Sequence, residues 1–433
     1  MKPAKKLTGV ALLAATALTL AGCGGATEAS STHTSAAPGS VTLRMTTWTS
    51  DATQLALFKS VADSYKKSHP EIKEITFDSL PVADYTSTLT TQIAGGNAPD
   101  MAWVLEKDAP DFVKSGALAP LTDTLKAAPD YNYADLNSET TKLWTQDNQL
   151  YAYPFSTSPL VMFANDSLLK QAGLPTSAEL QSQGKWNWQD LAALGSMVKA
   201  KTDKDGIIIR DFNYSDWSNL ASVWNAWGAA PWSSDGKSCT FNSPEMNTAF
   251  TYIHDGIFKQ HAFPGPGTSP DFFAGDSAFT VTQISRASLL KDAKFGWNVL
   301  PLPTATKGSY SVVGQAGVGA LAKGSHVQES EDFIAYLTNP SNAKQLAQFF
   351  PPPRTSLLTA DTLAATNKLL SKEQIQNAVI KGIAEGQTKA SHTNSAEISQ
   401  KVKAALDPMW QPTADVSSVL NNVCSAIKPL LAG

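Results

Sequence analysis

Strand and helix patterns alternate without a break in the first part of the chain, and this order restricts the folds open to it. The strand segments carry β-branched and apolar side chains in alternation, whereas the helical segments repeat apolar side chains every three or four residues. The predicted order is strand 41–48, helix 49–68, strand 71–80, helix 83–96 and strand 99–106. Such a βαβαβ order predicts parallel strands with crossover helices, and clefts at the carboxyl ends of the strands.

The alternation continues through most of the remaining chain. Ser243 before Pro244 is a strong helix start, Asn187 is a predicted cap, and the chain is largely helical from Glu329 onward. The further predicted elements are strand 149–156, helix 165–174, helix 186–201, strand 205–212, helix 242–259, a helix-turn-strand unit over 271–283, strand 294–303 and strand 311–324. A body of nearly four hundred residues with these elements predicts an α/β fold of two lobes.

The N-terminus has the pattern of a secretory signal. Lys2, Lys5 and Lys6 precede sixteen mostly small or apolar residues, 7–22. This run is shorter than the roughly 18 apolar residues that a membrane span needs. Its end, Leu-Ala-Gly before Cys23, resembles the bacterial lipobox, which implies lipidation of Cys23. An ordinary cleaved signal with an incidental cysteine, or a buried helix, is the alternative.

Residues 23–40 contain no large apolar side chain and are predicted to form a flexible tether after the signal peptide 1–22. The net charge of the whole chain is −4, and removal of the signal with its three lysines makes it about −7. This charge argues against nucleic acid as a partner, since nucleic acid requires a basic surface.

The remaining cysteines and the histidines suggest no cofactor. Cys239 and Cys424 can form one disulfide in an oxidising compartment, but Cys424 lies in a helical pattern that favours a buried thiol. His254 and His261 are seven residues apart, which is not a spacing for a shared metal on one helix face, and no nucleophile elbow occurs. We expect no metal, no cofactor and no catalytic residues.

Several segments in order resemble the extracellular solute-binding protein family 1, the maltose-binding-protein-like sugar-binding lipoproteins of ABC importers. The matching pieces are the strand ending in Trp48, AGGNAPDM (94–101), GALAPLTD (116–123), YAYPFSTSPLVMFANDSLLKQAGL (151–174), WNWQDL (186–191), FFAGDSAF (272–279), WNVLPLP (297–303) and residues 313–323. The sequence departs from the family after GDSAF, where Gln283 and Ser285 replace a frequent glycine and tryptophan.

The resemblance implies a periplasmic-binding-protein-like fold, in which two lobes joined by hinge crossovers enclose a central ligand cleft. The chain would cross near residues 153–156, 300–303 and Asn339. The implied lobes are 41–155 with 302–338, and 156–301 with 339–433. The implied partners are a carbohydrate ligand and the transmembrane subunits of an ABC permease, with the protein a monomer held at the extracellular face of the cell membrane by its lipid alone.

Aromatic side chains at the ends of elements are candidate sugar contacts, because sugars present an apolar C–H face to flat rings. Trp48 ends its strand at the predicted cleft edge, and Trp103 lies on a neighbouring strand. The segment 216–232 holds four tryptophans, of which Trp227 and Trp232 are candidates for the cleft. Trp217, Trp224 and Trp227 also have the spacing of a core-facing helical stripe, whereas Trp232 follows Pro231 in a predicted loop.

Polar groups around such a ligand would bind its hydroxyls. Asp51 and Asp100 are candidates, although each also suits a helix or turn cap. Gln283 and Ser285 occupy the position that the family uses for ligand. The last two polar candidates are Gln315, which lies between glycines, and Arg354, which follows three prolines and can grip two hydroxyls or pair with an acid in the hinge.

Three alternative functions differ from sugar capture. A glycerophosphodiester or other polyol is a different cargo, but a phosphate calls for a cluster of cations and the chain has only four arginines. A surface-anchored glycoside hydrolase would use two carboxylates far apart in sequence. A structural lipoprotein of the cell wall would have no cleft.

Overall fold

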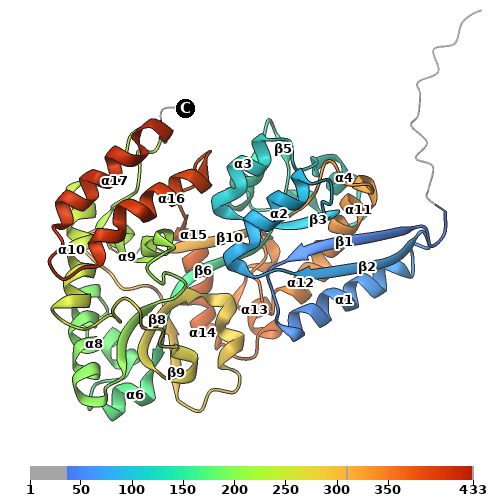
Figure 1. Ribbon diagram of the computed structural model, residues 1–433. Helices are drawn as coiled ribbons and strands as arrows, with labels where there is room; N and C mark the ends of the chain where they lie inside the picture. Colours follow the sequence, from blue (N-terminus) through green and yellow to red (C-terminus); the bar gives the residue numbers. More distant parts are fainter. Residues whose placement is uncertain (1–36, 309–310, 432–433) are drawn as a thin grey trace, which may run out of the picture. The chain divides into compact units, whose positions relative to one another are not determined.

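A mixed nine-stranded sheet organises the chain in the computed structural model, which describes residues 37–308 and 311–431 (Figure 1). The sheet order is β2-β1-β3-β10-β6-β8-β7, with β11 beside β10 and β9 beside β6. The strands are β1 (Val41–Thr47), β2 (Ile72–Ser79), β3 (Met101–Leu105), β6 (Tyr153–Asn165), β7 (Asp205–Ile209), β8 (Ser277–Gln283), β9 (Trp297–Leu300), β10 (Val312–Ala320) and β11 (Gln387–Thr388), and a separate hairpin is formed by β4 (Thr145–Gln146) and β5 (Gln149–Leu150).

Strands β2, β1 and β3 pair in parallel, which confirms the predicted βαβαβ unit. Helix α1 (Ala52–Lys66) packs against β2, and α2 (Tyr85–Ala94) leads into β3. The Asp51 carboxylate caps α1 by accepting hydrogen bonds from the backbone N–H groups of Thr53 and Gln54. Because β1 and β3 are parallel, their carboxyl ends lie at the same edge of the sheet.

Strand β6 joins the two halves of the sheet. Its first part pairs with β10 from Tyr153 to Pro159, and its second part pairs with β8 and β9 from Leu160 onward. We call β1, β2, β3 and β10 the first half-sheet, and β7, β8 and β9 the second half-sheet. Figure 1 shows β6 and β10 in the middle of the fold.

The length of β6 corrects the prediction of a strand over 149–156. Pro159 lacks the N–H that a strand interior needs, so the sequence argues against a strand at that position. In the structure this proline stands where the partner of β6 changes from β10 to β8. The missing donor therefore falls at the junction of two hydrogen-bond ladders.

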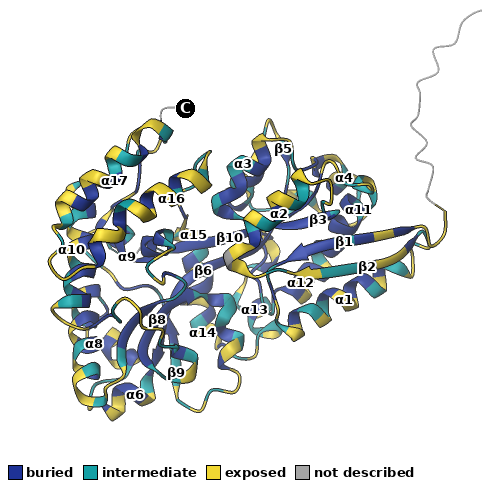
Figure 2. Cartoon of the chain, in the orientation of Figure 1, coloured by how far each residue is buried: buried dark blue, intermediate teal, exposed yellow. Residues whose placement is uncertain are grey.

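Helices cover both faces of the sheet, and Figure 2 shows their exposed outer surfaces around dark, buried strands. The predicted caps at Asn187 and Ser243 are confirmed, since their side chains accept from the N–H groups of Asp190 and Met246. The remaining α-helices are α3 (Ala109–Lys114), α4 (Thr122–Ala127), α5 (Ser138–Thr141), α6 (Asp166–Gln171), α7 (Ser177–Ser182), α8 (Trp188–Thr202), α9 (Ala221–Trp224), α10 (Pro244–Phe258), α11 (Val327–Leu337), α12 (Pro340–Leu346), α13 (Ala360–Thr366), α14 (Lys372–Gln374), α15 (Lys381–Glu385), α16 (Ser395–Leu406) and α17 (Val416–Leu431).

The tryptophans of segment 216–232 belong to the hydrophobic core beside the second half-sheet. Trp217, Trp224, Trp227 and Trp232 are all buried there, together with side chains of α8, α10 and α17. The interpretation of the spacing of Trp217, Trp224 and Trp227 as a core-facing stripe is therefore confirmed.

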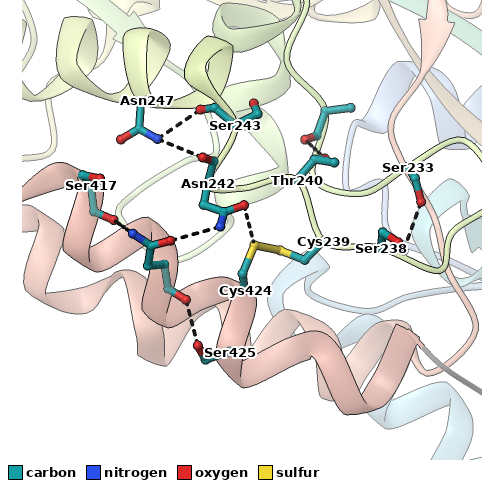
Figure 3. Close-up of a disulfide and its surroundings, with 12 residues drawn as sticks. Ser233, Ser238, Cys239, Thr240, Asn242, Ser243, Asn247, Ser417, Cys424 and Ser425 are labelled. Atoms are coloured by element: carbon teal, nitrogen blue, oxygen red, sulfur yellow. Dashed lines mark hydrogen bonds between the residues drawn. A yellow bond between two sulfur atoms is a disulfide. The ribbon is translucent and has the colours of Figure 1, made fainter.

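A disulfide joins Cys239 to Cys424, which lies on α17, and this bond corrects the expectation of a buried free thiol (Figure 3). The two Cα atoms are 5.4 Å apart, and 185 residues separate the cysteines in sequence. Nearby, the Asn242 side chain donates to Asn421 of α17 at 3.0 Å. The bridge and this hydrogen bond fix the C-terminal helix to the loop before α10.

Candidate functional site

A cleft of about 450 Å³ lies where the carboxyl ends of β1 and β3 meet strands β6, β8 and β10. Trp48 follows β1 and Glu106 follows β3, so both line the cleft because parallel strands end at one edge. Of the residues predicted as ligand contacts, six line this cleft: Trp48, Asp51, Trp103, Gln283, Ser285 and Gln315.

An aromatic cluster forms one wall of the cleft. Trp48 is partly exposed, and its ring contacts Trp103 and Tyr85 nearly at right angles, with centroid distances of 4.8 and 5.0 Å. Trp103 itself is buried and packs on Phe155 at 4.4 Å, with Phe350 behind both. Trp103 therefore supports the Trp48 ring, which is held rigidly at the surface of the cleft.

Serines line the floor of the cleft beside this aromatic wall. Ser156 and Ser158 of β6 both face it, and their hydroxyl oxygens are 3.2 Å apart. At the end of β8, the Gln283 amide oxygen accepts a hydrogen bond from the Thr282 hydroxyl at 3.1 Å. These hydroxyl and amide groups are suited to hydrogen-bond a polyhydroxylated ligand.

Strand alternation places the side chain of Gln315 on the opposite face of the sheet. In the pairing of β6 with β10, Ser158 and Gly314 lie opposite one another, and Thr157 lies opposite Gln315. The Gln315 amide donates to the Thr140 carbonyl at 3.1 Å and accepts from the Trp144 indole at 3.2 Å. We therefore assign the Gln315 side chain to the packing behind the cleft.

That opposite face has a cavity of its own. Its volume is about 740 Å³, and Thr157, Thr140 and Gln315 line it. The crossover strands β6 and β10 thus separate two cavities, of which only the one at the carboxyl ends of β1 and β3 contains Trp48.

The cations in the cleft are all engaged by carboxylates. Arg286 donates to Asp211 at 2.7 Å, and Lys107 pairs with its neighbour Asp108 at 2.8 Å. Lys389 lies 3.5 Å from the Glu106 carboxylate and donates to the Asn219 side chain at 2.7 Å. Each cation that lines the cleft therefore already has an acidic partner.

The pair formed by Glu106 and Lys389 is almost completely buried. Burial raises the pKa of the Glu106 carboxyl, and the charge of Lys389 opposes that rise. Close by, Asp111 accepts hydrogen bonds from the backbone N–H groups of Asn394 and Ser395, at the start of α16. These polar contacts attach residues 389–395 to Glu106 and to Asp111 of α3, both of which follow β3.

A strained turn carries the acid that pairs with Arg286. Asp211, Asn213 and Tyr214 have φ angles of 63°, 40° and 56°, in the left-handed region. The Asn219 side chain donates to the Asp211 carbonyl at 3.0 Å and holds the turn. Strain of this kind is common at ligand sites, where the surrounding structure maintains it.

Four predicted contact residues lie outside the cleft. Asp100 precedes β3, so it lies at the opposite end of that strand from Glu106, and its carboxylate accepts from the backbone N–H of Arg44 at 2.8 Å. Trp227 is buried 5.0 Å from the ring of Tyr252. Trp232 is buried in the same core as Trp227.

Arg354 is the fourth of these residues, and it is fully buried. Its guanidinium donates to the Thr338 and Asn132 carbonyls and lies 3.7 Å from the Asp135 carboxylate. The predicted role of Arg354 in binding two ligand hydroxyls is therefore wrong, and the structure supports the alternative, in which Arg354 pairs with an acid.

Cys23, the predicted lipidation site, lies outside the described residues.

The sequence interpretation missed several charged residues of the cleft. Asp211 follows β7 just as Trp48 follows β1, so the same rule about strand ends could have identified it. No local pattern identifies Lys389, because it reaches the cleft through long-range contacts of residues 389–395 with Glu106 and Asp111, which follow β3.

No group of three or more His, Cys, Asp or Glu side chains that could hold a metal occurs among residues 37–308 and 311–431. In that same part of the chain, every helix is too short or too polar to cross a bilayer. The fold has a mixed sheet whose two halves are joined by the crossover strand β6, and a cleft lined by aromatic and serine side chains lies where the halves meet. These features are typical of the class of two-lobed binding proteins.

Comparison with known proteins identifies the family. A family described as bacterial extracellular solute-binding protein matches residues 60–370, and the chain therefore belongs to it. The chain is also 25% identical over 352 residues to an uncharacterized lipoprotein in the oleD 5′ region of Streptomyces antibioticus, with 77% of this chain and 73% of that one covered.

Two solved structures illustrate the shared fold. The substrate-binding protein Lmo0181 of an ABC transporter from Listeria monocytogenes, in complex with cycloalternan, is 20% identical with a TM-score of 0.76, covering 90% of this chain and 98% of that one. UgpB from Mycobacterium tuberculosis, in complex with glycerophosphocholine, is 18% identical with a TM-score of 0.75, at the same coverage of both chains. At these identities the likeness concerns the fold.

Proposed function

We propose that this protein is the solute-binding component of an ABC importer, and that it captures a di- or oligosaccharide in the cleft and delivers it to a membrane permease. The observation that carries the proposal is the Trp48 ring, which is held by Trp103 and Tyr85 and lines the same cleft as several serines. An aromatic ring beside hydroxyl groups suits a ligand with an apolar C–H face and a hydroxyl rim.

The charges of the cleft favour a neutral ligand over a phosphodiester. A phosphate needs a cation that is free to bind it, usually an arginine in a bidentate pair. Here Arg286, Lys107 and Lys389 are each paired with a carboxylate. Replacement of such a partner by phosphate would leave a partly buried carboxylate without its cation.

The proposal extends to the division into lobes and to the mechanism of capture. We place the hinge at β6 and β10, with the halves of the sheet in different lobes. We propose the last crossing after Arg354 rather than near Asn339, because Phe350 packs on Phe58 and Trp103 and Arg354 donates to the Asn132 carbonyl. A ligand shifts such a hinge toward closure only if it contacts both lobes.

We also propose that Cys23 carries the lipid that anchors the protein at the extracellular face of the cell membrane. The lipobox pattern before Cys23 and the lipoprotein from Streptomyces antibioticus support this. The test is detergent partition of the protein made in a bacterial host. The natural sequence is expected in the detergent phase and Cys23→Ala in the aqueous phase; equal partition would contradict the anchor.

Calorimetric titration tests the ligand class. The mature protein is titrated with glucose, maltose, maltotriose, longer maltooligosaccharides, unrelated disaccharides and glycerophosphocholine, and the sugars are analysed afterwards. We expect a di- or oligosaccharide to bind and to be recovered intact. Failure of every sugar to bind would overturn the proposal. Binding of glycerophosphocholine alone would identify the polyol alternative, and new reducing ends would identify a hydrolase.

A further inference from the structure

We propose that Val82 and Leu289 form two apolar lips at the cleft mouth, which cover the outer apolar face of the bound sugar and set affinity for it. This inference rests on the proposed function, because it assigns two further contacts to the same ligand. The lips are defined as these two side chains, one at the start of the short 3₁₀-helix after β2 and one on the short helix after β8.

Large apolar side chains are rarely exposed in this protein. Among residues 37–308 and 311–431 the well-exposed ones are Val82, Met197 and Leu289, at 54%, 45% and 47%. Single exposed apolar side chains are ordinary on protein surfaces. However, two of these three line the same cleft, and they come from segments about two hundred residues apart in sequence.

The geometry of η8 (Ile284–Leu290) directs Leu289 into the cleft. A 3₁₀-helix has three residues per turn, so every third side chain lies on the same face. The buried column of η8 is Ile284, Ala287 and Leu290, which pack in the core beside β6. Arg286 and Leu289 form another column, and both line the cleft.

The position of Leu289 is fixed by its neighbour on the same face. Arg286 is tied to Asp211 at 2.7 Å, which holds η8 against the turn after β7. Leu289 is therefore presented by a helix that is anchored on one side by its buried column and on another by an ion pair. It does not need a contact of its own to stay at the cleft.

Val82 is presented from the other side by η1 (Val82–Asp84), which follows Pro81. The Tyr85 hydroxyl donates to the Thr46 carbonyl at 2.9 Å and fixes the end of this turn. The same tyrosine packs against Trp48 at 5.0 Å. Val82 thus belongs to the structural unit that holds the aromatic wall.

Leu289 supplies the apolar surface of the cleft on the side of the second half-sheet. The aromatic rings that line the cleft in the described chain are Trp48, Trp103, Phe155 and Phe350, and they form one cluster beside the first half-sheet. The segments that line the cleft from the second half-sheet are polar apart from Leu289. A sugar stacked on Trp48 would therefore present its other apolar face to Leu289, with Val82 at the rim.

The test compares three alanine variants of the full mature chain: Val82→Ala, Leu289→Ala and Met197→Ala. Met197 is the matched control, since it is equally exposed but lies on α8 and does not line the cleft. Each variant is titrated calorimetrically with maltose, maltotriose and the other sugars of the panel, at several temperatures. Thermal unfolding of each variant checks that the fold is intact.

We expect roughly tenfold weaker binding for Leu289→Ala, about threefold for Val82→Ala, and no change for Met197→Ala. The heat-capacity change of binding should become less negative for the two lip variants, because less apolar surface is buried. Unchanged affinity in both lip variants, with binding by the natural protein, would overturn the lips alone. Absence of sugar binding by the natural protein would overturn the proposed function and the lips with it.

Discussion

At the scale of single residues, Trp48 is the side chain on which ligand binding should depend most. Its ring is partly exposed in the cleft and held by Trp103 and Tyr85, so it needs little ordering when a ligand stacks on it. We expect Trp48→Ala to weaken sugar binding by about thirtyfold or more, equivalent to roughly 2 kcal/mol. Calorimetric titration measures this loss.

The control for that variant is Trp297→Ala, because Trp297 is also partly exposed but lies on β9 in contact with Phe163, outside the cleft. This substitution should lower thermal stability and leave affinity unchanged. Equal affinity of Trp48→Ala and the natural protein would show that the ring does not contact the ligand.

A second residue-scale prediction concerns the buried pair of Glu106 and Lys389. Burial raises the pKa of Glu106 above its ordinary value of 4.5, so the folded chain binds this proton more tightly than the unfolded chain. The difference matters at pH values between the pKa of the unfolded chain and the higher pKa of the folded protein. Its contribution to stability therefore falls as the pH rises through this window. Loss of the Lys389 charge would raise the pKa of Glu106 further and deepen that fall.

We expect Lys389→Met to lower the free energy of unfolding by about 3 kcal/mol at pH 7.5, and by less at pH 5, where Glu106 can be protonated. Urea unfolding at the two pH values measures both losses. The matched control is Lys372→Met, since Lys372 pairs with Asp361 in an exposed position and should cost less than about 0.5 kcal/mol. A loss for Lys389→Met that grows toward acid pH would contradict the argument.

At the scale of elements, much of the fold follows from periodicity and caps. The order of β1, α1 and β2, and the helix starts at Asn187 and Ser243, are encoded by neighbouring residues, so the sequence alone predicts them. The full length of β6 is not encoded in this way. Its Pro159 is tolerated only because two partner strands meet there, which is a property of the tertiary structure.

The cleft could be predicted in part, for the same reason. Trp48 and Asp51 follow a strand whose carboxyl end is predictable, and both line the cleft. Gln315 shows the limit, because one step of strand register turns its side chain to the opposite face. The position of Lys389 depends on long-range packing, and no short-range pattern contains that information.

The disulfide acts at the scale of elements because it ties α17 to the loop before α10. It closes a loop across 185 residues, so its loss should increase the entropy of the unfolded chain substantially. We expect the double variant Cys239→Ser/Cys424→Ser to lose about 2–5 kcal/mol of unfolding free energy. Urea unfolding with and without reductant measures this, and the reduced natural protein serves as the control.

Reductant should bring the natural protein to the stability of the double variant and leave the variant unchanged. Equal stability of the oxidised natural protein and the variant would contradict this account. Sugar affinity should stay the same, since neither cysteine lines the cleft.

At the scale of the whole molecule, the contacts across the cleft bear on the proposed hinge. Glu106 with Lys389, and Asp108 and Asp111 with the start of α16, make polar contacts there. Contacts of this kind can break and reform at modest cost, in contrast to a buried apolar interface. The strands β6 and β10 provide the continuous backbone connection about which two lobes could move.

Closure should therefore appear in solution when the sugar binds. Trp48 and Leu289 both line the cleft, and we expect a ligand to contact both of them only in the closed state. Such a ligand favours that state by the combined free energy of the two contacts. We expect the radius of gyration from small-angle X-ray scattering to fall when the natural protein is saturated with the sugar that binds best in the panel. Trp48→Ala at the same sugar concentration should keep the larger value, and its own saturation at higher concentration should restore the decrease. Saturation of the natural protein, verified by calorimetry, with an unchanged radius of gyration would mean that the cleft binds its ligand without hinge closure.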